Sequence, residues 1–279
     1  MTGHEAPFRG EPGANDVAEL IRAIAADPGR RLALAGTLNL RDIGGYPVSA
    51  PGQTGQAPGG WRTAWGTLFR ADAPHRPDAA AADGLAGFAG LGLRTVLDLR
   101  SSLEADYAPS PDFAGHGIAT MRIPLAGDDL AALPPDLGRI YDFVIDERGA
   151  SIASAVRALA RPGGVPGLVH CTAGKDRTGI VIALVLSAIG ASDVVVAADY
   201  ALSSLYLDPT RIAVIGRLHA EFDVDDQVTA ALMASPPELI LRVLDRARRQ
   251  AGSIAGYLTS HGVADEDLTR LRAALVTQS

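Results

Sequence analysis

The chain has 279 residues, 47% of them apolar and 20% charged, so it can bury a substantial core without a disulfide or a structural metal. Its formal net charge of −7, without a stripe of lysine or arginine, argues against binding to nucleic acid, which relies on a clustered basic surface. The single cysteine, Cys171, excludes an intrachain disulfide, and the six histidines are scattered, so we expect no metal and no cofactor.

The N-terminal part of the chain is predicted to be a disordered lead followed by one helix. Residues 1–14 are rich in glycine, proline and charge, and an amphipathic pattern predicts a helix over residues 16–26. We therefore divide the chain into a lead and helix, residues 1–30, and one folded domain, residues 31–279. The first residues do not have the pattern of a signal peptide, and the longest apolar run, residues 180–189, is about half a membrane span. We therefore expect no membrane insertion and a cytoplasmic location, with export without a signal peptide as the alternative.

Strand and helix patterns alternate along the middle of the chain, which indicates an α/β fold. The segment 39–46 is predicted to be a strand that gives way to a glycine turn, and further strands are predicted over residues 61–70, 94–99, 119–124 and 167–170. The predicted helices cover residues 78–90, 137–147 and 151–160. The acidic, proline-broken segment 128–135 is typical of a hinge, and residues 128–149 are predicted to form a helical lid.

The last third of the chain is predicted to be helical. Residues 178–189 are almost wholly apolar and are followed by Gly190, a pattern typical of a buried helix and its end. Every element from residue 193 to the end is expected to be a helix.

The segment that bears chemistry is His170-Cys-Thr-Ala-Gly-Lys-Asp-Arg-Thr-Gly179, between an apolar strand and an apolar helix. A tight loop that leads into a helix N-terminus binds anions, because its backbone N–H groups point inward and the helix dipole adds positive potential. We expect a phosphate-binding loop made of Cys171, Thr172, Ala173, Gly174, Lys175, Asp176 and Arg177.

The residue types in this loop suit transfer of a phosphoryl group to sulfur. Cys171 is the candidate nucleophile, since the positive field around it favours the thiolate. Arg177, five intervening residues later, can hold two phosphate oxygens in a way that lysine cannot. The Thr178 hydroxyl can donate to the sulfur when the phosphoenzyme is hydrolysed.

Other interpretations of the loop fit its residues less well. A lone buried cysteine before an apolar helix is more often a packing residue, but the arginine, glycines and threonine at these positions reverse that preference. The nucleotide-binding loop motif fails because Asp176 follows Lys175 and Val169 stands where that motif needs glycine. Sulfurtransferase loops are similar but one residue shorter.

The chain resembles the cysteine-dependent protein tyrosine phosphatases, in particular their bacterial tyrosine/serine and dual-specificity branch. Three further segments match signatures of that branch: Asn39-Leu-Arg-Asp-Ile-Gly-Gly45, Leu68-Phe-Arg-Ala-Asp72 and Leu97-Asp-Leu-Arg-Ser101. The resemblance implies a parallel-rich central sheet flanked by helices, with a helical lid insertion and a helical C-terminal region. It makes residues 31–279 a catalytic domain that hydrolyses phosphate monoesters through a cysteinyl-phosphate.

The resemblance leaves the general acid open. Many members take it from a Trp-Pro-Asp loop, and neither Trp61 nor Trp65 is followed by Pro-Asp. Asp98 is the first candidate and Asp176 the second, the alternative for Asp98 being an ion pair with Arg100.

The resemblance implies phosphotyrosine proteins as the primary substrates, with phosphoserine/threonine and phosphoinositides as alternatives. Phosphoinositide-active members often carry lysine or aspartate in the loop, as Lys175 and Asp176 do here. A phosphate-dependent binding module and a sulfurtransferase are the rival functions. Asn39, Arg41 and Asp42 are interpreted as scaffold, because Asn and Asp before two glycines usually form turns.

Overall fold

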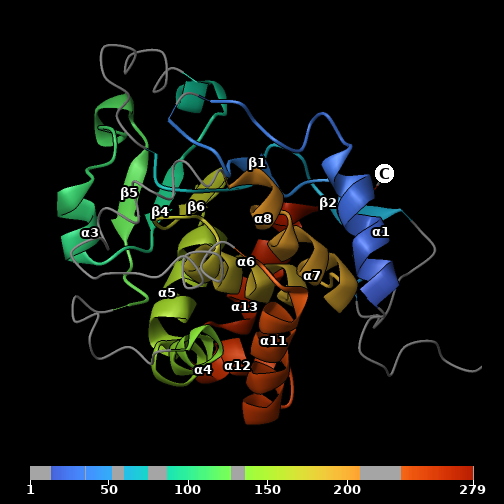
Figure 1. Ribbon diagram of the computed structural model, residues 1–279. Coiled ribbons are helices and arrows are strands. Elements are labelled where there is room, and N and C mark those ends of the chain that lie inside the picture. The colour runs from blue at the N-terminus through green and yellow to red at the C-terminus, as the bar shows by residue number, and fades with distance from the viewer. Residues whose placement is uncertain are drawn as a thin grey trace, which may run out of the picture.

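The computed structural model describes residues 14–34, 36–51, 60–74, 87–126, 136–207 and 234–278 (Figure 1). The strands are β1 (Arg41–Asp42), β2 (Trp61–Thr63), β3 (Leu68–Ala71), β4 (Thr95–Asp98), β5 (Ala119–Arg122), β6 (Gly167–His170) and β7 (Val276–Gln278). The helices are α1 (Ala14–Ala25), α3 (Ser102–Tyr107), η1 (Ala114–His116), α4 (Leu137–Glu147), α5 (Gly149–Ala160), α6 (Asp176–Ala188), α7 (Asp193–Ala201), α8 (Ser203–Tyr206), α11 (Pro237–Ala251), α12 (Ile254–Ser260) and α13 (Asp265–Leu275).

The central sheet has the strand order β1-β3-β6-β4-β5. The last four of these strands are parallel, and β1 pairs antiparallel to β3 at one edge. The carboxyl end of β6 therefore lies between those of β3 and β4, the place where parallel α/β sheets bind ligands. The predicted parallel-rich sheet flanked by helices is confirmed.

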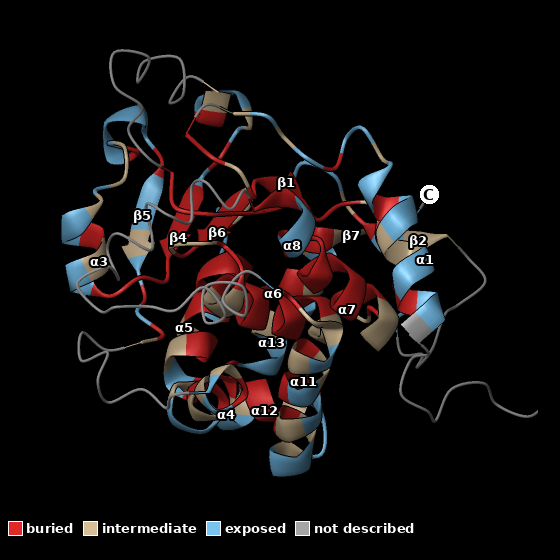
Figure 2. Cartoon of the chain, in the orientation of Figure 1, coloured by how far each residue is buried: buried red, intermediate tan, exposed pale blue. Residues whose placement is uncertain are grey.

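The side chains of the sheet alternate between two cores. Leu68, Leu97 and Val169 face the larger core, which the helices from α4 to α7 and α11 to α13 complete. Phe69 and Leu168 face a smaller core on the opposite side. The central strands β3, β4 and β6 and most of α6 are buried as a consequence, and Figure 2 shows buried residues in red. The site at the end of β6 is thus fixed from both faces.

Most predicted elements agree with the structure to within about two residues, the usual error for element ends. The predicted helix over residues 16–26 is α1, whose Val17 and Ile24 lie in the larger core. The predicted buried helix is α6, which begins at Asp176. The division of the chain at residue 30 stays a prediction. The predictions for residues 1–13, 78–86 and 128–135 lie outside the described residues.

Two predicted elements are wrong. The strand expected over residues 61–70 is interrupted, because Gly66 has a φ of +71° and the chain turns there between β2 and β3. The helical C-terminal region is confirmed, but its end is a strand. β7 pairs antiparallel with β2, with Trp61 opposite Gln278.

Helix α4, the described part of the lid predicted over residues 128–149, packs into the larger core. Its Val144 and Ile145 are buried in the larger core, and the Tyr257 hydroxyl donates to the Ile145 carbonyl at 2.7 Å. On its outer side, the guanidinium of Arg242 donates to the Asp142 carboxylate at 2.9 Å. These contacts tie α4 to α11 and α12, so a hinged movement of this helix would break core packing.

Candidate active site

Cys171 lies directly after the central strand β6, and its thiol is free and 1% exposed. Residues 171–175 form the turn that leads into α6, so the predicted strand, loop and helix are all present. Among the described residues, no group accepts a hydrogen bond from the backbone N–H of Ala173 or Gly174. An anion bound above the loop can take these donors together with the N-terminal end of α6.

Gly174 is the position at which the loop needs glycine. Its φ is +66°, and a Cβ there would lie 2.2 Å from the carbonyl oxygen of Ala71 on β3. Neither the conformation nor the space allows a side chain. The loop can approach β3 this closely only because residue 174 has none.

Arg177 is held by a carboxylate that the sequence analysis did not identify. Its Nη1 and Nη2 donate to the two oxygens of Glu104 at 2.5 and 2.6 Å, and the Thr172 hydroxyl donates to the same carboxylate at 2.5 Å. This end-on pair leaves the Nε side of the guanidinium for a phosphate. Burial alone raises the pKa of Glu104, but the hydrogen bonds and charge of Arg177 outweigh burial and lower it to about 2.

Glu104 reaches this position because it belongs to the first turn of α3. Its carboxylate accepts from the Ser101 N–H at 2.9 Å, and the Ser101 hydroxyl accepts from the Glu104 N–H at 3.3 Å. This is a capping box, which the Ser-x-x-Glu pattern would have revealed. The pattern identifies a helix start, but not the loop arginine that the same carboxylate binds.

Asp98, the first candidate for the general acid, is bound by Arg100. Nε and Nη2 of Arg100 donate to its two oxygens at 2.9 and 2.7 Å, and the Arg100 N–H adds a bond at 3.0 Å. Burial raises the pKa of Asp98, but the contacts with Arg100 and the nearby His170 ring outweigh it and lower the pKa below its ordinary value. The structure therefore contains the ion pair that was the alternative role for this residue.

Asp176, the second candidate, lies at the start of α6 and is more accessible. Its side chain is 29% exposed, against 4% for Asp98. It accepts a hydrogen bond of 2.5 Å from Tyr141 on α4, and the Tyr141 and Tyr200 hydroxyls lie 2.7 Å apart. Because Tyr141 gives its one proton to Asp176, Tyr200 donates to Tyr141.

The two remaining predicted loop side chains are buried. The Lys175 ammonium donates to the Ala234 carbonyl at 2.8 Å and lies 3.4 Å from the Asp176 carboxylate. The Thr178 hydroxyl is buried and has no hydrogen-bond partner among the described residues. A buried hydroxyl without a partner is uncommon, and this one is seven residues after the nucleophile, in the first turn of α6.

His170 supports the loop from the buried side. Its Nδ1 lies 3.4 Å from the Cys171 carbonyl and 3.9 Å from the Asp98 carboxylate. Burial lowers the pKa of His170 to about 4, although the charge of Asp98 opposes this. The imidazole is therefore neutral at physiological pH and is part of the scaffold.

The shifted His170 pKa predicts a loss of stability in mild acid. The unfolded chain takes up a proton near pH 6.5, whereas the folded chain does so only near pH 4, so the contribution present above pH 6.5 is lost as the pH falls to 4. The free energy of unfolding is expected to drop by about 3 kcal/mol over this range. In urea titrations, His170→Gln should remove most of this drop. An equal drop in His170→Gln and in the exposed control His116→Gln would contradict the prediction.

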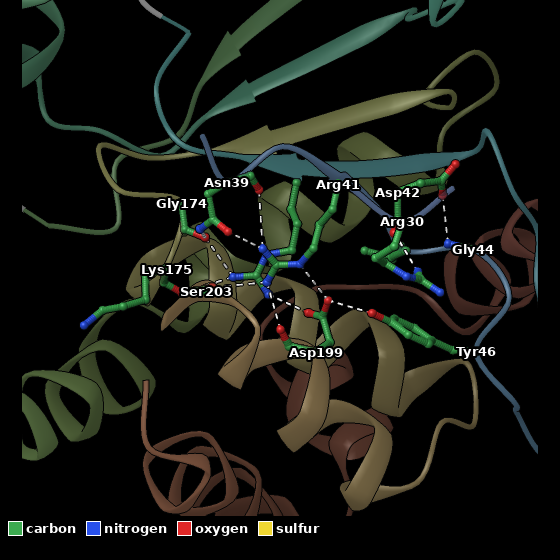
Figure 3. A network of polar contacts seen from close by, with 12 residues as sticks. Arg30, Asn39, Arg41, Asp42, Gly44, Tyr46, Gly174, Lys175, Asp199 and Ser203 are labelled. Carbon is green, nitrogen blue, oxygen red and sulfur yellow. Dashed lines mark hydrogen bonds and ion pairs between the residues drawn. The ribbon is translucent and has the colours of Figure 1, made fainter. Parts of the chain in front are cut away.

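The signature residues near β1 and β3 hold the backbone of the loop (Figure 3). Asn39 Nδ2 donates to the carbonyls of Ala173 and Gly174, both at 3.1 Å, and Arg70 Nη2 donates to the Gly174 carbonyl at 2.8 Å. Arg41 binds Asn39 and is fully buried. These contacts agree with the scaffold interpretation of the N-terminal signature.

Within the described residues, no group of three or more His, Cys, Asp or Glu side chains could hold a metal ion.

Of the described helices, none has the length and apolar character needed to span a membrane.

Comparisons with known proteins agree with the site. The profile of the tyrosine phosphatase family matches residues 32–277. The triple specificity protein phosphatase PtpB of Mycobacterium tuberculosis is 31% identical over 255 residues, which cover 76% of this chain and 91% of PtpB. A tyrosine-protein phosphatase of Nostoc commune is 29% identical over 278 residues, covering 91% of this chain and 92% of that protein.

Solved structures of one bacterial protein are also similar, though weakly. Crystal structures of P. aeruginosa TpbA, one of them in complex with pTyr, share 16% identity over 78% of this chain and 98% of theirs. Their TM-score of 0.30 is too low to support an argument about the fold. The match over residues 32–277 and the similarity to PtpB are sufficient without it: the chain belongs to the tyrosine phosphatase family.

Proposed function

We propose that the chain hydrolyses phosphotyrosine in proteins through a cysteinyl-phosphate on Cys171. The observation that carries the proposal is the loop itself, in which the only cysteine opens and Arg177 closes a turn at the carboxyl end of the central strand. This short segment combines backbone N–H groups that have no acceptor among the described residues, the N-terminus of α6 and the Arg177 guanidinium, three kinds of group that bind phosphate. Family membership supports the same reaction.

The reaction divides into two displacements at phosphorus. The Cys171 thiolate attacks the phosphate while the bond to the tyrosine oxygen breaks, and the leaving oxygen takes a proton from a carboxylic acid. Water then attacks phosphorus while its proton passes to the carboxylate left by the first step, and the S–P bond breaks to release inorganic phosphate and the thiolate. Arg177 and the loop N–H groups bind the equatorial oxygens in both steps, and the Thr178 hydroxyl donates to the departing sulfur in the second.

Asp176 is the better candidate for the acid. It belongs to the loop, and its side chain remains partly exposed although Tyr141 donates to it and the Lys175 ammonium lies 3.4 Å away. Asp98 is buried and committed to Arg100 on both of its oxygens, an arrangement that favours the ionised form and leaves no proton to donate.

A leaving-group series separates the two carboxylates. Asp176→Asn is expected to lower kcat by about 10²-fold for a phosphotyrosine peptide, whose leaving oxygen needs a proton, and much less for p-nitrophenyl phosphate, whose leaving group does not. Asp98→Asn should lower both rates by the same factor and destabilise the fold. If Asp98→Asn alone were selective for the poorer leaving group, Asp98 would be the acid.

The experiment that tests the proposed function is rapid-quench labelling of the native chain during turnover of a phosphotyrosine peptide, with chelator present. Intact-mass analysis should find one added phosphoryl group, mapped to the peptide that contains Cys171. Turnover without this species would exclude the cysteinyl-phosphate mechanism. Binding of the phosphopeptide without turnover would favour the phosphate-dependent binding module.

Phosphoserine/threonine and phosphoinositides remain alternative substrates within this proposal, and PtpB is named for triple specificity. The Lys175 ammonium, which could contact an extra phosphate of an inositol head group, is buried and engaged by the Ala234 carbonyl. That engagement favours phosphotyrosine. Turnover of a phosphotyrosine peptide, its phosphoserine counterpart and a phosphoinositide ranks the three classes. The cytoplasmic location stays a prediction.

A further inference from the structure

A carboxylate far from the signature motifs lies beneath the phosphate loop. Asp199 on α7 is 1% exposed, and its two oxygens accept from the two fully buried arginines of the signatures (Figure 3). Arg41 Nε donates to Oδ1 at 3.1 Å, and Arg70 Nη1 donates to Oδ2 at 2.5 Å. The Tyr46 hydroxyl donates to Oδ1 at 2.9 Å. Asp199 is thus the shared anion of two buried cations.

Both arginines continue from Asp199 to the loop. Arg70 reaches it directly, since its other nitrogen, Nη2, donates to the carbonyls of Gly174 and Lys175 at 2.8 and 3.3 Å. Arg41 reaches it through Asn39, whose backbone carbonyl accepts from Arg41 Nη1 at 3.3 Å and whose amide binds the loop. Arg70 therefore links Asp199 to the loop, because Nη1 binds the carboxylate and Nη2 binds the loop carbonyls.

The direction of these bonds determines where the loop donors point. In a trans peptide unit the carbonyl and the N–H point to opposite sides. The carbonyls of Ala173 and Gly174 are held toward Asn39 and Arg70. The N–H groups that share those peptide units, on Gly174 and Lys175, therefore point away from the arginines, toward the side on which the proposed function puts the phosphate.

We propose that Asp199 is a positioning residue for the phosphate loop, acting through Arg70. The inference rests on the proposed function for the identity of the anion, but its content is geometric. Two buried guanidinium groups cannot keep fixed positions without an anion between them, because each would repel the other and lose its hydrogen-bond partner. Asp199 fixes the Arg70 guanidinium, which holds the Gly174 carbonyl. The orientation of that carbonyl determines where the N–H group of the same peptide unit points.

The decisive variant is Arg70→Lys. Lysine keeps the positive charge beside Asp199, but a single ammonium cannot donate to Asp199 and to the Gly174 carbonyl with the geometry of the two guanidinium nitrogens. The matched control is Arg30→Lys. Arg30 is also buried, at 2% exposure, but it donates to the Asp42 carbonyl and stacks on Tyr46 and Trp65. Asp199→Asn is the companion variant.

The measurements are tungstate affinity by calorimetry, kcat, KM and melting temperature. Tungstate is a tetrahedral oxyanion that is not turned over, so its affinity measures how well the loop N–H groups are oriented toward a bound anion. Arg70→Lys is expected to lower tungstate affinity and kcat by about 10- to 100-fold, the effect of a small misplacement of reacting groups. Arg30→Lys should lower the melting temperature with unchanged tungstate affinity. Asp199→Asn, if it folds, should resemble Arg70→Lys.

The positioning role and the proposed function would be contradicted by different results. A folded Arg70→Lys protein with native tungstate affinity and native kcat would overturn it, even if Asp199→Asn fails to fold. A native chain that binds tungstate but hydrolyses no phosphate ester would refute the proposed function. In that case weaker tungstate binding by Arg70→Lys, but not by Arg30→Lys, would still support the positioning role.

Discussion

Replacing Cys171 with serine is expected to abolish hydrolysis of an aryl phosphate, with kcat lower by about 10⁴-fold or more. In the proposed mechanism the thiolate attacks phosphorus, whereas a serine hydroxyl is not ionised near neutral pH and would need a base beside it. His170 does not provide one, because it contacts the Cys171 carbonyl rather than the sulfur. The measurement is steady-state turnover with chelator present.

The variant should keep the anion site, which separates chemistry from binding. The loop N–H groups, Arg177 and Glu104 are unchanged by the substitution, so Cys171→Ser should bind tungstate with near-native affinity. The side chain is buried, and serine differs from cysteine only in having an oxygen in place of the slightly larger sulfur, so the melting temperature should change little. If Cys171→Ser retained a tenth of the native kcat or more, another residue would be the nucleophile.

The sequence was sufficient to predict the loop and its two flanking elements, because their signals are local. An apolar strand, a glycine-containing turn and an apolar helix follow one another within residues 167–188. The spacing of Cys171 and Arg177 is likewise a property of one short segment. Local patterns of this kind depend on nothing distant in the chain.

Elements that depend on distant pairing were predicted less well. The strand β7 exists because it pairs with β2, more than two hundred residues earlier in the chain. By itself, Val276–Gln278 continues a helical segment. The break at Gly66 was missed for a related reason, since its turn lets β3 enter the central sheet while β2 pairs with β7.

The supporting carboxylates of the site show the same limit. Glu104 and its partner Arg177 are 73 residues apart, and Asp199 and Arg70 are 129 apart. The sequence around each carboxylate holds a local signal: the capping box at Ser101 for Glu104, and for Asp199 its position within the apolar stretch that follows the first residue of α7. A buried acid predicts that some cation lies nearby. It does not identify which of the many arginines that cation is.

Arg177→Lys is expected to lower kcat by about 10³-fold, the second largest effect that we predict. A guanidinium can bind Glu104 with its two terminal nitrogens and still present Nε to the phosphate. A lysine ammonium lacks the planar, two-sided arrangement of N–H donors, so it cannot bind the Glu104 carboxylate and two phosphate oxygens of the transition state at the same time. Stopped-flow and steady-state rates with an aryl phosphate measure the loss.

Two comparison variants show whether geometry or charge is responsible. Arg248→Lys also disrupts a two-nitrogen pair with a carboxylate, that of Asp193, but on the outer helices, and should leave kcat unchanged. Glu104→Gln keeps the guanidinium and removes only the charge that orients it, so its loss should be smaller than that of Arg177→Lys. If Arg177→Lys retained most of the native rate, a positive charge alone would be sufficient at this position, and the loop would not depend on two-oxygen recognition of the phosphate.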